Sequence, residues 1–171
     1  MSSDSVSIIP QTGDYVRAAG ELIVAIQRDE FGFAMSIDNQ PDLVDVDGYY
    51  RLGKGNFWIA LSEGRVIGTI ALKDIGNGQG ALRKMFVHPD FRGAAAGVAQ
   101  RLLQVLLDWC QVQGFQTVFL GTTERFQAAH RFYERNGFVP VAQEDLPAAF
   151  PLMGVDTRFY VRRLGARSSA Q

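Results

Sequence analysis

Short apolar runs recur along the chain, each about as long as one β-strand and bounded by turn-forming residues. Each run predicts a strand, and the runs cover residues 6–9, 57–61, 66–72, 81–87, 117–120, 138–141 and 155–161. The turn Glu63-Gly64-Arg65 separates the second run from the third. That spacing predicts a β-hairpin.

Longer segments repeat apolar residues every three or four positions, which predicts helices. They are expected from near Gly13, within residues 42–50, over 97–113 and over 124–136. Thr12 and Thr123 stand where they can cap the first and the last of these helices. The resulting order, β-α-(α)-β-β-β-α-β-α-β-β, predicts a mixed sheet with helices packed on it.

The chain has 171 residues, which fits one domain over residues 6–164 with a flexible tail over 165–171. Apolar residues make up 47% and charged residues 20%, and the formal net charge is −1. This balance argues against a nucleic-acid partner, because such proteins usually carry a strongly basic face. No apolar stretch approaches the ~18 residues of a membrane helix, so no membrane partner is expected.

Two further features favour a cytoplasmic, reducing location. Residues 1–7 are polar and lack the apolar centre of a signal peptide. Cys110 is the single cysteine, so no internal disulfide can form. It stands in an apolar helical run, which favours a small core residue over a nucleophile.

Residues 92–103 lead from a predicted strand into the long predicted helix, with Gly93 and Gly97 at the turn. A turn of this kind directs free backbone N–H groups and the positive end of the helix dipole at one place. Such a place binds phosphate. A plain strand–helix turn carries the same glycines, so the motif alone leaves a cofactor site and a structural turn open.

Two motifs and the order of elements resemble the GNAT superfamily of acyl-CoA-dependent N-acyltransferases. The first comprises residues 85–89, Arg92-Gly93 and 97–99, and the second is residues 129–138. The resemblance covers residues 7–164. It implies an α/β fold, with a central mixed, mostly antiparallel sheet of about seven strands that splays between strands 4 and 5.

The resemblance also implies acetyl-CoA as cosubstrate and no metal. The turn N–H groups would hold the pyrophosphate, and the fourth strand would bond the pantetheine amides and supply an oxyanion donor near Phe86 or Val87. Arg92 would add a charge-assisted contact to the phosphates. The residues expected to bind the cofactor are Met85, Phe86, Val87, Arg92, Gly93, Ala96, Gly97, Val98, Ala99 and Phe132.

The phosphate loop departs from the family pattern Gln/Arg-x-x-Gly-x-Gly/Ala, which fits in two registers. One register ends at Ala99 and puts Ala94 at the basic position, within a loop two residues longer than usual. The other begins at Arg92 and loses its first glycine to Ala95. We prefer the first, because the leucine pair of the following helix then falls in place.

A second departure concerns a polar contact to the cofactor. Similar proteins often place asparagine three residues before the alanine at position 129, and this chain has Phe126 there. Thr122 or Thr123 is the expected replacement.

The resemblance assigns Tyr133 as the general acid that protonates the departing thiolate. A core aromatic is the competing interpretation of Tyr133. A thiol pKa of ~8.5 already makes the thiolate a fair leaving group, so this help should be modest. Glu30 and Glu124 are the candidate bases, directly or through water, although each is also interpretable as a solvated carboxylate.

The two histidines are expected to be structural or solvated. His88 precedes proline in a loop, and His130 lies on a predicted helix between arginines. With one buried cysteine, they give no pattern for a metal site or a Cys–His dyad.

The amine acceptor is expected between the first helix, the loop after it and the hairpin. This region is acidic and aromatic, with Glu30, Phe31, Phe33, Asp38, Gln40, Asp42, Asp45, Asp47, Tyr49 and Tyr50. It predicts a cationic acceptor with some apolar surface, such as a polyamine, an amino compound or a peptide amine. A solvated loop whose aromatic residues only cap the core is the open alternative. Residues 146–151 are expected to form a further wall.

Two functions follow. The first is an N-acetyltransferase in which the amine attacks acetyl-CoA directly, with Tyr133 as acid. The alternative is a non-catalytic acyl-CoA-binding sensor with the same fold, which the altered phosphate loop and Phe126 favour. A homodimer is left open.

Overall fold

The computed structural model describes residues 6–93, 97–124 and 127–165. Seven strands form one sheet in the order β1-β2-β3-β4-β5-β7-β6. The strands are β1 (Val6–Pro10), β2 (Asn56–Ser62), β3 (Arg65–Gly76), β4 (Gln79–Val87), β5 (Thr117–Thr122), β6 (Val139–Val141) and β7 (Arg158–Arg163). The helices are α1 (Val16–Asp29), α2 (Pro41–Val44), α3 (Val46–Tyr50), α4 (Val98–Gln113) and α5 (Gln127–Arg135). Short 3-10 turns cover Gly13–Tyr15, Pro89–Phe91 and Gln143–Asp145.

The sheet is mixed and mostly antiparallel, as expected from the sequence. β4 and β5 pair in parallel, and the other neighbouring strands pair antiparallel. The parallel pair requires a crossover, which α4 supplies. The predicted order of elements is therefore confirmed.

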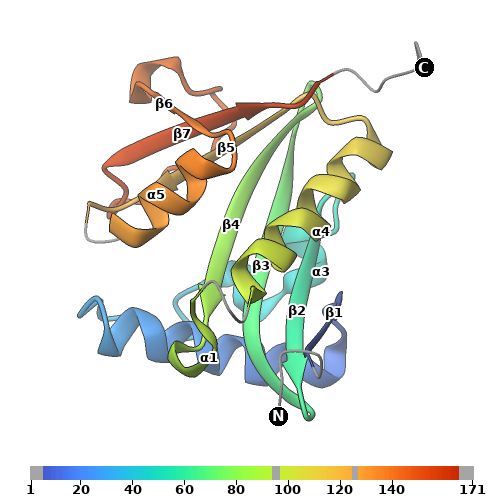
Figure 1. The fold of residues 1–171 in the computed structure, drawn as a ribbon, viewed down its shortest axis with the longest axis vertical. Coiled ribbons are helices and arrows are strands. Elements are labelled where there is room, and N and C mark those ends of the chain that lie inside the picture. Colours follow the sequence, from blue (N-terminus) through green and yellow to red (C-terminus); the bar gives the residue numbers. More distant parts are fainter. Residues whose placement is uncertain (1–5, 94–96, 125–126, 166–171) are drawn as a thin grey trace.

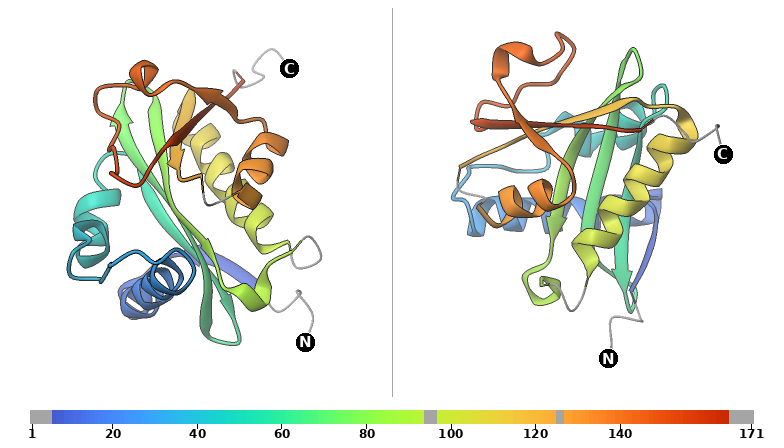
Figure 2. Two further views of the ribbon diagram at one scale, coloured as in Figure 1. Left: turned by 90° about the vertical axis from the view of Figure 1, so that its left-hand side faces the viewer. Right: turned by 45° about the horizontal axis from the view of Figure 1, so that its top comes forward.

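Helices cover both faces of the sheet, with α4 and α5 on one side and α1 and α3 on the other (Figure 2). Under α4, a core of fully buried side chains includes Leu102, Leu106 and Ile70. On the opposite face, Ile23 of α1 packs in a second cluster with Ile59. Strands that are covered on both faces have near-continuous apolar sequences, which explains the runs in β2 and β3.

Cys110 lies in the core beneath α4 and is fully buried. Burial raises the pKa of its thiol to about 12. A thiol in this state is protonated and chemically inert at neutral pH. The expectation that Cys110 is a core residue is confirmed.

The sheet opens between β4 and β5. The two strands pair only at Gln79 with Thr117, Gly80 with Val118, and Ala81 with Phe119. Beyond these pairs they diverge, and β5, β7, β6 and α5 lie apart from the lower part of β4 (Figure 1). The predicted splay between the fourth and fifth strands is present.

A β-bulge interrupts β4 at the start of this opening. Thr69 pairs with Phe86 and Ala71 pairs with Arg83, so β4 holds one residue more than β3 over this stretch. Lys84 takes up the extra length in a left-handed conformation, with φ of 54°. The Thr69 hydroxyl donates a hydrogen bond of 2.7 Å to the Lys84 carbonyl and fixes the bulge. A non-glycine residue held this way is often found at a functional site.

Several predicted boundaries shift. Thr12 is the N-cap residue of the 3-10 turn that precedes α1, and its side chain makes no capping bond. Val155 lies in the loop before β7, which begins at Arg158. Two short helices replace the single one expected within residues 42–50.

Some predictions fall on residues that are not described. Ala96 and the other alanines of the phosphate loop, Phe126, and the tail over 166–171 lie outside the described residues. In the described part of the chain, no helix has the length and apolar character needed to cross a bilayer.

The packing of α4 predicts a large difference between two apolar side chains on that helix. Leu106 is fully buried, whereas Val112 is 69% exposed. Leu106→Ala should lower the free energy of unfolding by about 2–5 kcal/mol, because it removes packed methyl groups and leaves a cavity. Val112→Ala should change it by less than about 0.5 kcal/mol. Urea unfolding of both variants measures the difference, and equal effects would contradict this packing.

Candidate active site

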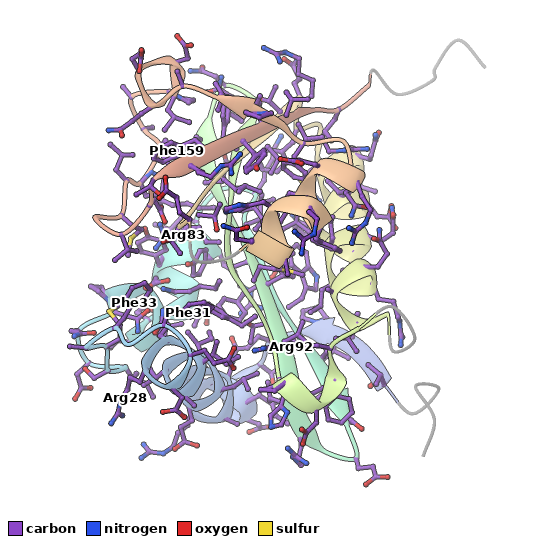
Figure 3. All side chains as sticks on the ribbon, turned by 60° about the vertical axis from the view of Figure 1, so that its left-hand side comes forward. Arg28, Phe31, Phe33, Arg83, Arg92 and Phe159 are labelled. Atoms are coloured by element: carbon purple, nitrogen blue, oxygen red, sulfur yellow. The ribbon has the colours of Figure 1, made fainter. Side chains whose placement is uncertain are left out.

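A cavity of about 740 Å³ occupies the opening between β4 and β5. Its wall includes β4 from Leu82 to Val87, residues 121–123 at the end of β5, and one side of α5. The loop after α1 contributes Phe31 and Phe33, which lie on the same side of the molecule as Arg83 (Figure 3). One continuous cavity therefore joins the start of α4 to the loops on the opposite face of the sheet.

At one end the cavity reaches the N-terminus of α4. Gly97 precedes this helix with φ of 65°, a left-handed conformation that glycine adopts without strain. Gly97, Ala99 and Gln100 line the cavity, whereas the Val98 side chain is buried in the core. The first N–H groups of a helix have no acceptor within it, so those of Val98 and Ala99 are available to an anion. Val98 can contribute only through its backbone.

The Arg92 guanidinium, in the loop after β4, forms an ion pair. Its two terminal nitrogens pair with both carboxylate oxygens of Glu30 at 2.8 Å, and its Nε donates to the Val87 carbonyl at 2.8 Å. This ion pair joins the residue after α1 to the loop after β4, and the contact of Arg92 with the pyrophosphate stays a prediction. The pair also occupies Glu30, one of the two candidate bases.

The edge of β4 that faces the opening carries the other expected cofactor residues. Met85, Phe86 and Val87 line the cavity beyond the bulge. They follow Ala81, the last residue of β4 that pairs with β5. Backbone groups on this edge can therefore bond an extended ligand as a further strand would.

Tyr133 projects from α5 into the middle of the cavity wall and is 5% exposed. Its ring contacts the rings of Phe132, Phe138 and Tyr160. Burial, and to a smaller extent the carboxyl of Asp156, raises the pKa of Tyr133. The phenol is therefore protonated at neutral pH and able to donate. Phe132 also lines the cavity, as expected.

Thr122 offers an unused polar atom at the same place. Its Oγ1 is buried and has no hydrogen-bond partner among the described residues. Thr122 and Thr123 both line the cavity. A buried hydroxyl without a partner is costly, so a ligand that bonds it would be stabilised. This fits the expectation that Thr122 or Thr123 replaces the missing asparagine.

The prediction that His130 is solvated is wrong. Its side chain is buried, and Nε2 lies 2.9 Å from the Thr123 carbonyl oxygen. The ring packs beside Tyr160, because this side of α5 faces β7 rather than solvent. His88, as expected, has a local role, with Nδ1 accepting a hydrogen bond from the Asp90 N–H.

Asp156, which no sequence motif indicated, also lines the cavity and contributes a carboxyl group. Burial raises its pKa to about 6, against the opposing effect of Arg83 and Lys84. A Cβ at Gly121 would lie 2.6 Å from an Asp156 carboxylate oxygen. The glycine on β5 therefore provides the space in which this carboxyl group lies. The sequence offered little indication that Asp156 is a site residue, because it stands inside a run that predicts a strand.

Arg83 and Lys84 were also missed, and both line the cavity. Lys84 Nζ donates to Gln40 at 2.6 Å and lies 3.4 Å from an Asp42 oxygen. Arg83 Nε donates to the Tyr50 hydroxyl at 3.1 Å, and that hydroxyl donates to Asp42 at 2.5 Å. The sequence could have indicated these two residues, because two adjacent cations interrupt an otherwise apolar strand.

The expected acceptor region is only partly on the cavity wall. Of its ten residues, Glu30, Phe31 and Phe33 line the cavity. Asp42 and Tyr50 are buried behind Arg83, and Asp45 and Asp47 are exposed and bond Gly48 and Arg51. The acidic character of this segment therefore does not describe the cavity. Phe150 and Pro151 line it, in keeping with the wall expected over residues 146–151.

Glu124 is exposed and is not part of the cavity wall. Its backbone N–H donates to the Thr157 hydroxyl at 3.1 Å. In the described part of the chain, no three His, Cys, Asp or Glu side chains come together as metal ligands would.

Comparison with known proteins gives a consistent result. N-acetylaspartate synthetase from Danio rerio is 33% identical over 106 residues, which is 61% of this chain and 37% of that protein. This chain therefore spans little more than a third of that curated relative. The structure of an acetyltransferase of the GNAT family from Staphylococcus aureus Mu50 matches with a TM-score of 0.89 and 35% identity, over 94% of this chain and 99% of the other.

A more distant structure shares the fold. The PaiA N-acetyltransferase from Thermoplasma acidophilum, in complex with coenzyme A, has a TM-score of 0.71 and 16% identity over 94% of this chain and 99% of its own. The model of the acetyltransferase (GNAT) family matches residues 21–138, which hold β2 to β5, the bulge, α4 and the Tyr133 helix. With both motifs and the splayed sheet inside that match, the chain belongs to the GNAT acetyltransferase family.

Proposed function

We propose that this protein transfers the acetyl group of acetyl-CoA to a primary amine of a small molecule or peptide, by direct attack in a ternary complex. The observation that carries the proposal is the continuous cavity from the α4 N-terminus, past the free edge of β4, to Tyr133. The related N-acetylaspartate synthetase has a name that describes acetylation of an amino acid. The distant PaiA structure holds coenzyme A.

The cofactor would enter from the side of α4 and α5. Its pyrophosphate would be held by the N–H groups at the start of α4, and Arg135 on the cavity wall would supply a positive charge. The pantetheine arm would lie along β4 between Met85 and Val87, and Thr122 would supply a polar contact. This arrangement brings the thioester to Tyr133 through the opening in the sheet.

In the reaction, the nitrogen lone pair of the amine attacks the thioester carbonyl carbon and forms the C–N bond. A backbone N–H of β4 stabilises the oxyanion near Phe86 or Val87. The C–S bond then breaks with its electron pair on sulfur, and Tyr133 donates a proton to that sulfur. Before it attacks, the ammonium gives one proton to a separate acceptor, and after the C–S bond breaks the amide nitrogen gives its second proton to the Tyr133 phenolate.

The earlier candidates for that proton acceptor have different surroundings. Glu30 lies on the cavity wall in its pair with Arg92, and Glu124 is exposed outside the wall. Both stay predictions, as do the cytoplasmic location and a homodimer.

Replacing Tyr133 tests the acid. Tyr133→Phe should lower kcat by about 10- to 100-fold with little change in the KM for acetyl-CoA. The phenylalanine ring still packs in the same place, but it has no hydroxyl proton to give to the thiolate. Tyr160→Phe is the matched control, since Tyr160 is also buried and its hydroxyl bonds Glu134 away from the cavity wall. Initial rates of coenzyme A release measure both variants. An unchanged kcat in Tyr133→Phe would exclude the acid role.

The same assay separates the enzyme from a sensor. Saturable binding of acetyl-CoA with no release of coenzyme A, over a wide panel of amines, would favour the non-catalytic alternative.

A negative charge at the start of α4 should weaken cofactor binding. Ala99→Asp places a carboxylate beside the N–H groups assigned to the pyrophosphate, and should raise the Kd for coenzyme A by about 10-fold or more. Binding of pantetheine, which lacks the pyrophosphate, should change little. Isothermal titration with both ligands makes the comparison, and an equal loss for both would place the pyrophosphate elsewhere.

A further inference from the structure

Among the described residues, the charged side chains on the cavity wall fall into three groups. Arg92 and Glu30 neutralise each other. Arg135 is exposed on α5 and lines the cavity, and we assign it to the cofactor side. Arg83, Lys84 and Asp156 remain, and none of them has a role in holding or cleaving the thioester. These three lie close enough to influence one another's ionisation.

Arg83 has hydrogen-bonding capacity to spare. Its side chain is only 10% exposed, and its one short bond goes from Nε to Tyr50. Its terminal nitrogens make long contacts, 3.4 Å to the Pro151 carbonyl and 3.5 Å to the Met153 sulfur, and lie 3.8 Å from Asp42. Such contacts are weaker than the 2.7–2.9 Å bonds typical of a guanidinium and a carboxylate. A ligand carboxylate would fill this site.

The network behind Arg83 holds its position. Asp42 accepts a hydrogen bond from Tyr50 and lies near Lys84, and Lys84 also bonds Gln40. Gln40 in turn exchanges hydrogen bonds with Gln27 of α1. A buried network in which the groups bond one another resists rearrangement. Arg83 is therefore a fixed cation at the cavity wall.

Asp156 supplies the opposite charge in the same part of the cavity. Its carboxyl faces the gap left by Gly121 on β5, and it interacts electrostatically with Tyr133 of α5. Arg83 and Lys84, counted together with Asp42 and Asp156, give no net charge. A ligand with no net charge but with both signs, such as an amino acid zwitterion, leaves that balance intact.

We propose that the acceptor is a free α-amino acid with an apolar side chain, whose carboxylate binds Arg83 and whose ammonium group binds Asp156, which takes its proton. The proposal rests on the proposed acetyl transfer and names the substrate class of the same site. It replaces the cationic acceptor expected from the sequence.

The apolar side chain follows from the rest of the wall. Its uncharged residues on this side are mainly Phe31, Phe33, Met35, Phe150 and Met153. An acidic side chain would need a further cation, and Arg92 is already paired with Glu30. An apolar side chain would instead be stabilised by burial against these rings and thioethers.

The chemistry balances without another reactant. The ammonium passes one proton to the Asp156 carboxylate, and the freed lone pair forms the C–N bond to the acetyl carbon. The C–S pair leaves on sulfur, which is protonated by Tyr133. The products are the N-acetyl amino acid and coenzyme A. The amide nitrogen passes its second proton to the Tyr133 phenolate as the tetrahedral intermediate collapses, and Asp156 releases its proton to water. A carboxyl pKa of about 6 suits a base that works near neutral pH.

Matched acceptors test the substrate class. We expect kcat/KM for phenylalanine to exceed that for phenethylamine, which lacks the carboxylate, by about 100-fold, because a site built to bind a charged group rejects a ligand without it. Phenylalaninamide should resemble phenethylamine, and aspartate should be a poor acceptor. Release of coenzyme A measures all four.

The outcomes separate the two proposals. Turnover of phenethylamine equal to or above that of phenylalanine would overturn the amino acid acceptor while keeping the acetyltransferase. Preference for aspartate over phenylalanine would overturn the apolar side chain. Binding of acetyl-CoA without turnover of any amine would remove the proposed function and this inference with it.

Arg83→Gln tests the carboxylate site. The ratio of kcat/KM for phenylalanine to that for phenethylamine should fall from about 100 toward one, because only the first ligand loses its partner. Taking the ratio within one variant removes any effect of a smaller folded fraction. Arg83→Lys keeps the charge and should retain part of the preference. An unchanged ratio in Arg83→Gln would place the carboxylate elsewhere.

Asp156→Asn tests the base through the pH profile. Wild-type kcat/KM should rise as the pH passes through about 6, because Asp156 must lose its proton before it can accept one. The groups that face it are Arg83 and Lys84 from β4 and Tyr133 from α5. In Asp156→Asn, this rise of kcat/KM near pH 6 should disappear, and kcat at pH 7.5 should fall by at least about 100-fold. Asp108→Asn, on the exposed side of α4, is the control and should keep both. If kcat/KM of Asp156→Asn still rises near pH 6, Asp156 is not the base.

Discussion

The divergence of β4 and β5 after three paired residues is the constraint on which the rest of the site depends. A continuous ladder would use every backbone group of β4 and close the sheet. The opening instead leaves one edge of β4 free and joins the two faces of the molecule. The start of α4 lies on one face and the loop after α1 on the other (Figure 2). Cofactor and acceptor can therefore approach from opposite sides and meet at Tyr133.

The bulge at Lys84 adds the second essential element. In a regular strand, adjacent side chains point to opposite faces, so neighbouring Arg83 and Lys84 would not both lie near Asp42. The left-handed residue breaks this alternation, and both Arg83 and Lys84 line the opening. The buried network with Asp42 and Tyr50 then compensates charges that would be costly if left alone. Backbone irregularity and buried charge are thus parts of one arrangement.

The sequence was sufficient for the fold and for residues whose role depends on local pattern. Gly97 before an apolar helix, and Tyr133 within its motif, lie on the cavity wall as the motifs indicated. Long-range pairing was not accessible in this way. Arg92 meets Glu30 across 62 positions of sequence, and Asp156 reaches the site only because Gly121 on another strand leaves room. Such contacts depend on tertiary packing, for which the local sequence carries no signal.

The burial of Cys110 has a practical consequence for studying the protein. Coenzyme A release creates a new thiol, and the reagents that detect it react with thiolates. The chain has one cysteine, and that residue is enclosed beneath α4 with its pKa raised to about 12. The folded protein therefore contributes almost no background colour of its own. The same reagent can also measure unfolding, because the Cys110 thiol reacts once the core opens.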